Sequence, residues 1–196
     1  MSPQTSPQVA IRPYAMGDAS LLYEAVMESR GELAPWMPWM HADYGMADAR
    51  LFVESRMLAF SSGADFAFVI EDDAGALLGA CGLNQIDRVN RRGNLGYWVR
   101  SSRLGRGVAT AAARQVLDWA FAHTGLHRIE VLASVDNHAS QRVAEKAGGT
   151  REAVLRQRLL LGDRAHDAIL YAFLRSEAAA VTTGVAYKAP ADTRHP

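Results

Sequence analysis

The chain has 196 residues, 49% of them hydrophobic, and this length suits one domain with a full hydrophobic core. Its 21 Lys and Arg residues equal its 21 Asp and Glu residues, so bulk charge gives no reason to expect binding to nucleic acid or to a membrane surface. The single cysteine, Cys81, excludes an internal disulfide framework and fits a reducing compartment. Because no stretch approaches the roughly 18 apolar residues of a membrane span and no signal-peptide core opens the chain, we expect a cytoplasmic protein.

The first half of the chain predicts helices and strands in mixed order. Residues 1–8 are polar and contain proline, which indicates a flexible N-terminus, and a strand is expected over residues 9–14. Asp18 is expected to cap the helix that follows, because a short acidic side chain bonds the free N–H groups of a first turn. That helix carries four apolar residues at helical spacing, namely Leu21, Leu22, Ala25 and Val26. The further elements are a helix over about 48–60 and strands near 66–71, 77–84 and 95–100, whose turns at 72–75 and 90–93 indicate an antiparallel run.

The second half continues with a long helix, expected from Gly107 to about His123 and ended by Gly125. Its buried side is expected to carry Ala111, Val116, Leu117, Ala120 and Phe121. After it come a strand over 128–135, a helix over 139–147, strands near 154–161 and 168–175, and an aperiodic tail over 177–196 that we expect to be mobile. This order predicts an α+β domain in which helices pack on a central mixed sheet.

A glycine-rich turn joins the strand at 95–100 to the long helix, and it reads Leu104-Gly105-Arg106-Gly107-Val108-Ala109-Thr110. A helix that opens on small residues leaves its first backbone N–H groups bare, with the positive end of the helix dipole behind them. Such an end binds phosphate, and small side chains leave the approach open. The turn therefore predicts a phosphorylated ligand.

Five motifs and the element order together resemble the GNAT acyltransferases, in particular the branch that acetylates N-terminal α-amines of ribosomal proteins. The turn matches the family pattern Q/R-x-x-G-x-G/A in its last Gly and Ala but departs from it at Leu104. The other four stretches are Leu95-Gly96-Tyr97-Trp98-Val99, Asp136-Asn137-His138-Ala139-Ser140 with Glu145-Lys146-Ala147-Gly148, Trp36-x-x-Trp39, and Gly162-Asp163-Arg164-Ala165-His166-Asp167. The resemblance implies one GNAT N-acetyltransferase domain over residues 9–176, with a mixed, mostly antiparallel sheet flanked by helices.

The resemblance also implies that acetyl-CoA binds as co-substrate at the glycine-rich turn. The residues implied to contact it are Trp98, Val99, Leu104, Gly105, Arg106, Gly107, Val108, Ala109, Thr110 and Asn137. The backbone N–H groups from Arg106 to Thr110 would hold the pyrophosphate, and the main chain of Trp98 and Val99 would pair with the pantetheine arm like an added strand. Arg103 and Arg106 could meet the phosphates or remain solvated, and Asn137 could contact the arm or only end a strand.

Ser140 is the leading catalytic candidate, because the branch that the chain resembles uses a serine at this position to assist the departing thiolate, although it could instead be an ordinary serine of a helix N-terminus that bonds locally. The tyrosine that many GNAT enzymes carry for this task is replaced here by Ala144. The general base is open: Glu130 could serve or be a surface strand residue, and Asn94 stands where many relatives have a glutamate. Gly149 also departs from the family, which usually has an aromatic residue there.

The acceptor is expected to be an amine, and a protein or peptide N-terminal α-amine is the first hypothesis. A small-molecule amine and a non-catalytic CoA-binding module remain alternatives. Trp36 and Trp39 could line the acceptor groove, because flat amphipathic rings bind peptide chain well, or could instead belong to the core. The histidines show no metal-ligand spacing, so no metal is expected, and a homodimer is compatible with the resemblance.

Overall fold

The computed structural model describes residues 8–178. The helices are α1 (Asp18–Glu28), α2 (Arg30–Leu33), α3 (Met46–Ser62), α4 (Val108–His123), α5 (His138–Ala147) and α6 (Arg175–Ala178), with a 3-10 turn η1 (Ser101–Arg103). The strands are β1 (Val9–Pro13), β2 (Phe66–Asp72), β3 (Leu77–Asp87), β4 (Arg92–Val99), β5 (Arg128–Ser134), β6 (Thr150–Leu161) and β7 (Arg164–Leu174). The flexible segments predicted over 1–8 and 177–196 lie outside the described residues, apart from Gln8 and the end of α6.

The seven strands form one sheet in the order β1-β2-β3-β4-β5-β7-β6. Every neighbouring pair is antiparallel except β4 and β5, which run parallel. The predicted mixed and mostly antiparallel sheet is thus confirmed. The parallel pair is joined by α4, since parallel neighbours need a long crossover.

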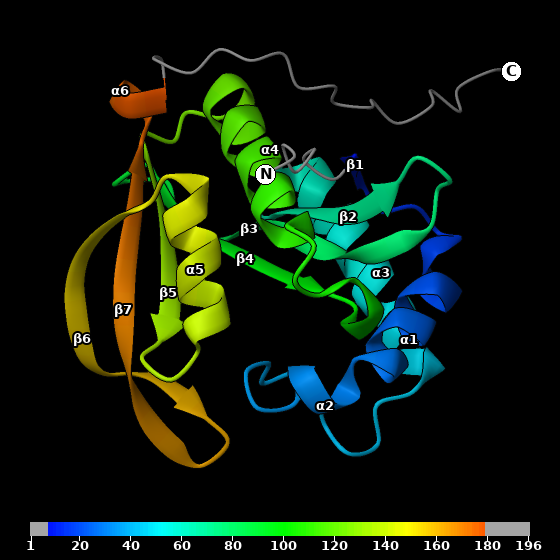
Figure 1. Cartoon of the computed structure of the whole chain (residues 1–196). Coiled ribbons are helices and arrows are strands. Elements are labelled where there is room, and N and C mark those ends of the chain that lie inside the picture. Colours follow the sequence, from blue (N-terminus) through cyan, green and yellow to red (C-terminus); the bar gives the residue numbers. More distant parts are fainter. Residues whose placement is uncertain (1–7, 179–196) are drawn as a thin grey trace, which may run out of the picture.

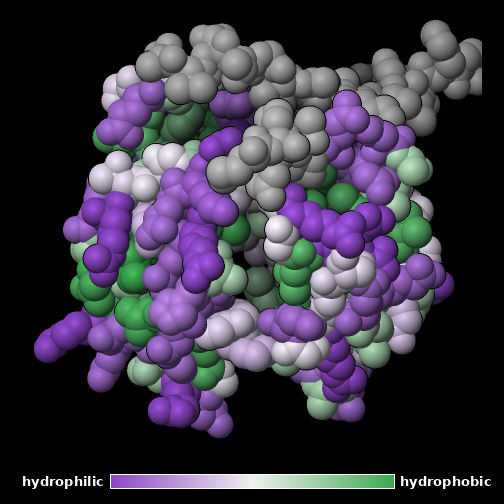
Figure 2. All heavy atoms as spheres, viewed as in Figure 1, coloured by the Kyte–Doolittle hydropathy of each residue, from purple (hydrophilic) through white to green (hydrophobic). Residues whose placement is uncertain are grey.

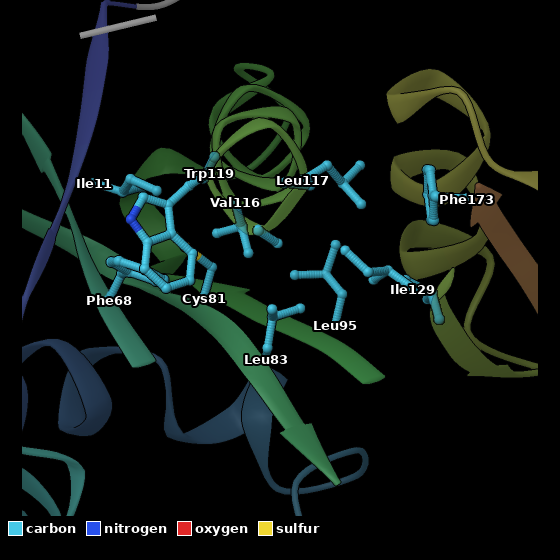
Figure 3. Packing of buried hydrophobic residues seen from close by; sticks show 14 of the residues in the cluster. Ile11, Phe68, Cys81, Leu83, Leu95, Val116, Leu117, Trp119, Ile129 and Phe173 are labelled. Carbon is cyan, nitrogen blue, oxygen red and sulfur yellow. The ribbon is translucent and has the colours of Figure 1, made fainter. Parts of the chain in front are cut away.

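Helices cover both faces of the sheet (Figure 1). Alternate residues of β2 show the division, because Phe68 and Ile70 pack with α4 whereas Val69 packs with α1 and α3. In Figure 3, Val116, Leu117 and Trp119 of α4 lie against strand side chains such as Leu95. The two faces therefore carry separate hydrophobic cores.

The start of α1 differs from the expectation. Gly17 occupies the N-cap position, and no side chain caps the helix. The Asp18 carboxylate instead accepts hydrogen bonds from the Ala15 N–H at 2.7 Å and from the Arg12 guanidinium at 2.7 Å. Asp18 therefore ties the helix to β1 through an arginine, and Leu21 is 38% exposed because it lies outside the apolar stripe of α1.

Sequence periodicity located α4 but placed one of its residues wrongly. Ala111 is only partly buried, whereas Ala112 and Ala113 are fully buried, so the buried stripe is displaced by one residue at its start. The structure also accounts for Gly149, where the family usually has an aromatic residue. A Cβ atom at Gly149 would lie 2.7 Å from Cζ of Phe173, whose ring from β7 fills this space, so a side chain at 149 would overpack by about 1–3 kcal/mol.

Candidate active site

Strands β4 and β5 separate after a short parallel pairing. Arg92, Gly93 and Asn94 pair with 128–130, and the ladder between the two strands ends there within the described residues. Farther along, β4 and β5 diverge (Figure 1), so residues 95–99 of β4 present backbone N–H and C=O groups to the gap. A row of unpaired backbone groups can accept an extended ligand as an added strand.

The glycine-rich turn lies at the far end of this gap. Gly105 and Gly107 have left-handed backbone angles, with φ of +72° and +80°, which a residue with a Cβ adopts only at a cost. Gly107 is the N-cap of α4, and no side chain caps the helix there. The first N–H groups of α4 are therefore available to an anion, as the predicted phosphate contact requires. Arg106 is exposed, whereas Arg103 lies 3.8 Å from the Asp72 carboxylate.

The segment between β4 and the turn is fastened to the end of α1. The Ser101 N–H donates to Oγ of the fully buried Ser29 at 3.0 Å, and the Ser102 N–H donates to the Glu28 carboxylate at 3.0 Å. Arg100 Nε donates to the same carboxylate at 2.8 Å. These contacts, with Ser102 first and Arg100 after it, lower the pKa of Glu28 to about 2. The turn is thus held by donors that need Glu28 ionised.

Tyr97 and Ser140 meet across the gap between β4 and α5. The Tyr97 hydroxyl donates to the Ser140 backbone carbonyl at 2.9 Å, and its oxygen lies 3.1 Å from Ser140 Oγ. Burial raises the pKa of Tyr97 to about 12, so the phenol stays protonated near neutral pH. Since the tyrosine proton goes to the carbonyl, Ser140 Oγ can donate its own proton to the tyrosine oxygen or to a ligand atom in the gap.

The remaining predicted residues around α5 and β5 have clear structural contacts. Asn137 Oδ1 accepts from the Ser140 N–H at 3.0 Å and so caps α5. Both oxygens of Glu130 are bound, one to Arg128 at 2.6 Å and the other to Arg92 at 3.1 Å. Arg128 also binds Glu152, so Glu130 belongs to an ion network at the β4–β5 junction.

A hollow lies between α5 and the turn that leads into α4 (Figure 2). On the opposite, α1–α3 face of the sheet, two cavities adjoin each other. One, of about 330 Å³, is mostly apolar and lies under α1 and α3. The other, of about 290 Å³, extends from Tyr97 of β4 across the sheet to the start of β2. Trp39, Phe52 and Trp98 line both cavities.

Trp36 and Trp39, which were predicted together as one patch, therefore lie in different surroundings. Trp39 lies between the cavities, with its ring centroid 6.3 Å from that of Trp98. Trp36 is partly buried and lines neither cavity. Trp98 itself points to this face, so only its main chain can serve the β4–β5 gap.

Asn84, Arg56 and Asp65 are among the polar residues that line the second cavity. Asn94 Nδ2 donates to Asn84 Oδ1 at 2.9 Å between the neighbouring strands β4 and β3. Asp65, directly before β2, forms an ion pair with Arg56 of α3. Burial raises the pKa of the Asp65 carboxyl, and the Arg56 charge opposes that rise.

Sequence reasoning missed Tyr97, Asp65 and Tyr14 as site residues. For Tyr97 a signal existed, because it alternates with Leu95 and Val99 on the buried face of a strand, where a hydroxyl needs a partner. For Asp65, the only signal is an acid directly before a buried strand. Its cavity neighbours come from distant parts of the chain.

Comparison with known proteins assigns the family. The family model described as an acetyltransferase (GNAT) domain matches residues 8–150. The chain belongs to the GNAT acetyltransferase family. It is 28% identical over 172 residues to the ribosomal-protein-serine acetyltransferase of Escherichia coli strain K12, covering 86% of this chain and 94% of that protein.

Solved structures of GNAT acetyltransferases share the fold. Mycobacterium smegmatis RimJ in complex with CoA-disulfide matches with a TM-score of 0.80 at 28% identity, covering 88% of this chain and 84% of that one. The spermidine N-acetyltransferase of Vibrio cholerae in complex with CoA and spermine matches with a TM-score of 0.72 at 22% identity, covering 86% and 96%.

This GNAT protein is an N-acetyltransferase that uses acetyl-CoA and acts on an amine acceptor. The uncapped start of α4, the glycines with positive φ and the free edge of β4 fit a long ligand with a pyrophosphate at one end. None of the helices within residues 8–178 is long and apolar enough to cross a membrane.

Proposed function

We propose that the protein acetylates the N-terminal α-amine of a protein or peptide. The observation that carries this proposal is the composition of the acceptor-side cavity, which begins at Gly96 and Tyr97 beside the β4–β5 gap. Within residues 8–178 its only carboxylate, Asp65, is already paired with Arg56, and the adjoining cavity has one more, Asp48, which accepts a hydrogen bond from the Gly45 N–H. A polyamine carries several positive charges and needs several unpaired carboxylates, whereas a peptide terminus has one amine followed by neutral backbone.

In this proposal acetyl-CoA enters the gap between β4 and β5. The backbone N–H groups of the turn 104–110 hold its pyrophosphate, and the edge of β4 at Trp98 and Val99 pairs with its pantetheine arm. Asn137 supports this side by fixing the first turn of α5, which carries Ser140. Arg106 lies at the surface of the turn and is placed to meet a phosphate.

The chemical step moves the acetyl group directly from sulfur to nitrogen. The neutral amine attacks the thioester carbon, the C–N bond forms, the C–S bond breaks, and the nitrogen releases a proton. Ser140 Oγ donates a hydrogen bond to the departing sulfur, and Tyr97 holds Ser140 in place. An α-amine has a pKa near 8, so a usable fraction is already neutral and its proton can leave to water. We assign Glu130, with both oxygens bound by arginines, to ordering the β4–β5 junction.

The test is thiol release from acetyl-CoA against a panel of amines. The panel contains peptides with free α-amines, the same peptides with the α-amine blocked, a lysine side-chain amine, and spermidine. We expect release that disappears when the α-amine is blocked. Release with spermidine or the lysine amine, and none with free peptide termini, would assign the protein to another acceptor class.

A further inference from the structure

Two buried side-chain oxygen atoms among residues 8–178 lack a hydrogen-bond partner, and both belong to residues lining one cavity. They are the hydroxyl of Tyr14 and Oδ1 of Asp65, and the cavity is the one of about 290 Å³ on the acceptor side. Buried polar groups in folded proteins are almost always paired, so an unpaired one calls for a reason. Both side chains line the same cavity, so one ligand group could pair with both oxygens if a small rotation of each side chain exposes them.

The two atoms have complementary hydrogen-bonding roles. The Tyr14 hydroxyl is a donor, since burial raises the pKa of the phenol and keeps its proton in place. Oδ2 of Asp65 is bound by Arg56, which leaves Oδ1 as an acceptor. The pair of Arg56 and Asp65 has no net charge, so this end of the cavity is neutral.

The group that satisfies both atoms must donate and accept hydrogen bonds and carry no charge. An ammonium group has donors only: the Tyr14 oxygen could accept from it, but the Tyr14 proton would still lack an acceptor. A carboxylate has acceptors only and would face the Asp65 oxygen with like charge. A methyl group would leave both atoms unpaired, at a cost that is substantial for buried polar groups. A hydroxyl or a primary amide meets both requirements.

The position of these atoms limits where such a group can lie on the acceptor. Tyr14 directly follows β1 and Asp65 directly precedes β2, whereas the proposed function puts the reacting amine at the edge of β4. Strands β2 and β4 are two spacings apart in the sheet, about 10 Å. The hydroxyl of an N-terminal serine is only three bonds from its own amine and is too close. The second residue, or a long amide side chain on the first residue, can reach.

We propose that Tyr14 and Asp65 form a specificity subsite for a neutral hydroxyl or primary amide group near the acceptor's N-terminus. The inference rests on the proposed function, because it concerns the chain attached to the α-amine. Both residues determine which acceptor is used and take no part in the transfer of the acetyl group.

Peptide competition tests the subsite and separates the two sources of the group. The peptides share one sequence and begin Ala-Ala, Ala-Ser, Ala-Asn, Gln-Ala, Ala-Lys or Ala-Asp. We expect kcat/KM for Ala-Ser and Ala-Asn, or for Gln-Ala, to exceed that for Ala-Ala by about 10-fold or more. A preference for Ala-Ser and Ala-Asn assigns the group to the second residue of the acceptor. A preference for Gln-Ala assigns the group to the first residue. Equal values across the neutral peptides, or a preference for Ala-Lys or Ala-Asp, overturn the subsite. Silence with every peptide contradicts the proposed function instead.

Variants show whether the named residues cause the preference. Tyr14→Phe removes one hydroxyl, and the double variant Arg56→Met with Asp65→Leu removes the other partner without leaving the arginine unpaired. We expect each variant to reduce the preference to about 3-fold or less while kcat/KM for Ala-Ala stays within about 3-fold of the original. Tyr23→Phe, on α1 and outside both cavities, is the matched control and keeps the preference. A preference that survives both Tyr14→Phe and the double variant overturns the assignment.

Discussion

The acetyl-CoA side and the acceptor side proposed for this protein differ in the groups that would contact a ligand, which are backbone groups on the first side and side chains on the second. In the proposed function, the backbone provides the contacts on the acetyl-CoA side: the free edge of β4, two glycines with positive φ, and the uncapped start of α4. On the acceptor side, side chains would provide them, and the cavity is lined by Tyr14 after β1, by Asp65, by residues of α3, β2, β3 and β4, and by the segment around Trp39. The first side lies within residues 95–110, and the second exists only after folding.

This difference explains why a GNAT protein can change its acceptor while keeping its co-substrate. Backbone contacts tolerate most changes of side chain, provided that the glycines remain. Side-chain contacts change with any single substitution in a loop or strand end. Variants on the acetyl-CoA side should therefore affect every acceptor equally.

The largest effect is expected from Gly107→Asp. The new carboxylate would stand at the start of α4, where it would obstruct the pyrophosphate and repel it. We expect the Kd for acetyl-CoA, measured by calorimetry, to rise by about 100-fold with every acceptor affected alike. Gly75→Asp is the matched control, because Gly75 has nearly the same φ, +79° against +80°, in the turn between β2 and β3. If both variants bind acetyl-CoA as the original protein does, the turn is not the phosphate site.

Ser140→Ala is expected to lower turnover next. In the proposed mechanism, loss of the hydroxyl removes the donor to the departing sulfur, and such contributions are worth about 100-fold in kcat. The Kd for acetyl-CoA should change by less than about 3-fold, since Ser140 acts on the reacting atoms. The measurement is kcat from thiol release beside the Kd from calorimetry, and an unchanged kcat would contradict the role of Ser140.

Tyr97→Phe should have a smaller effect of the same kind. The variant removes the contact that positions Ser140, and one hydrogen bond of this kind contributes about 1 kcal/mol, or about 5-fold in kcat. Combined with Ser140→Ala, the tyrosine substitution should add almost nothing, because both act through one hydroxyl. Fully additive effects in this double-mutant cycle would show that Tyr97 acts independently.

The smallest effect is expected from Glu28→Gln, which loosens the segment before the turn. In the folded protein the pKa of Glu28 is lowered to about 2 from its ordinary 4.5, so its contacts stabilise the fold fully above pH 4.5 and are lost as the pH falls through about 2. The difference in urea midpoint between the original protein and the variant should be constant near pH 6 and shrink toward pH 3. The difference should be small, because the carboxylate is partly exposed. A difference that grows on acidification would contradict these contacts.

Much of the fold follows from the sequence because apolar periodicity is local. The strands β2 to β5 and the helices α4 and α5 lie within a few residues of their predicted bounds. The one-turn helix α2 and the 3-10 turn η1 were missed, since neither is long enough to show a period. The predicted start of β6 was Val154, whereas the strand begins at Thr150. Register shifts between Arg151 and Ala153 and between Leu155 and Leu159 interrupt the apolar alternation of this strand, so its start was missed.

The candidate site, like the fold, could be predicted only where the signal is local in the sequence. The turn 104–110 was located from its glycines, because a positive φ restricts residue type directly. The contact of Tyr97 with Ser140 was not predicted, since these residues are 43 positions apart. The pairing of Arg56 with Asp65 and the place of Tyr14 depend on how α3, β1 and β2 pack, and no spacing in the sequence encodes them.

The most direct measurement is a crystal structure of the protein with CoA. Our account predicts the pyrophosphate on the N–H groups of residues 106–110, the pantetheine arm along the edge of β4 at Trp98 and Val99, and the sulfur within hydrogen-bond distance of Ser140 Oγ. The cavity of Tyr14 and Asp65 should remain on the other side of the sulfur, free for the acceptor. A sulfur atom far from Ser140, or a CoA molecule that occupies the acceptor cavity, would contradict the separation of the two sides.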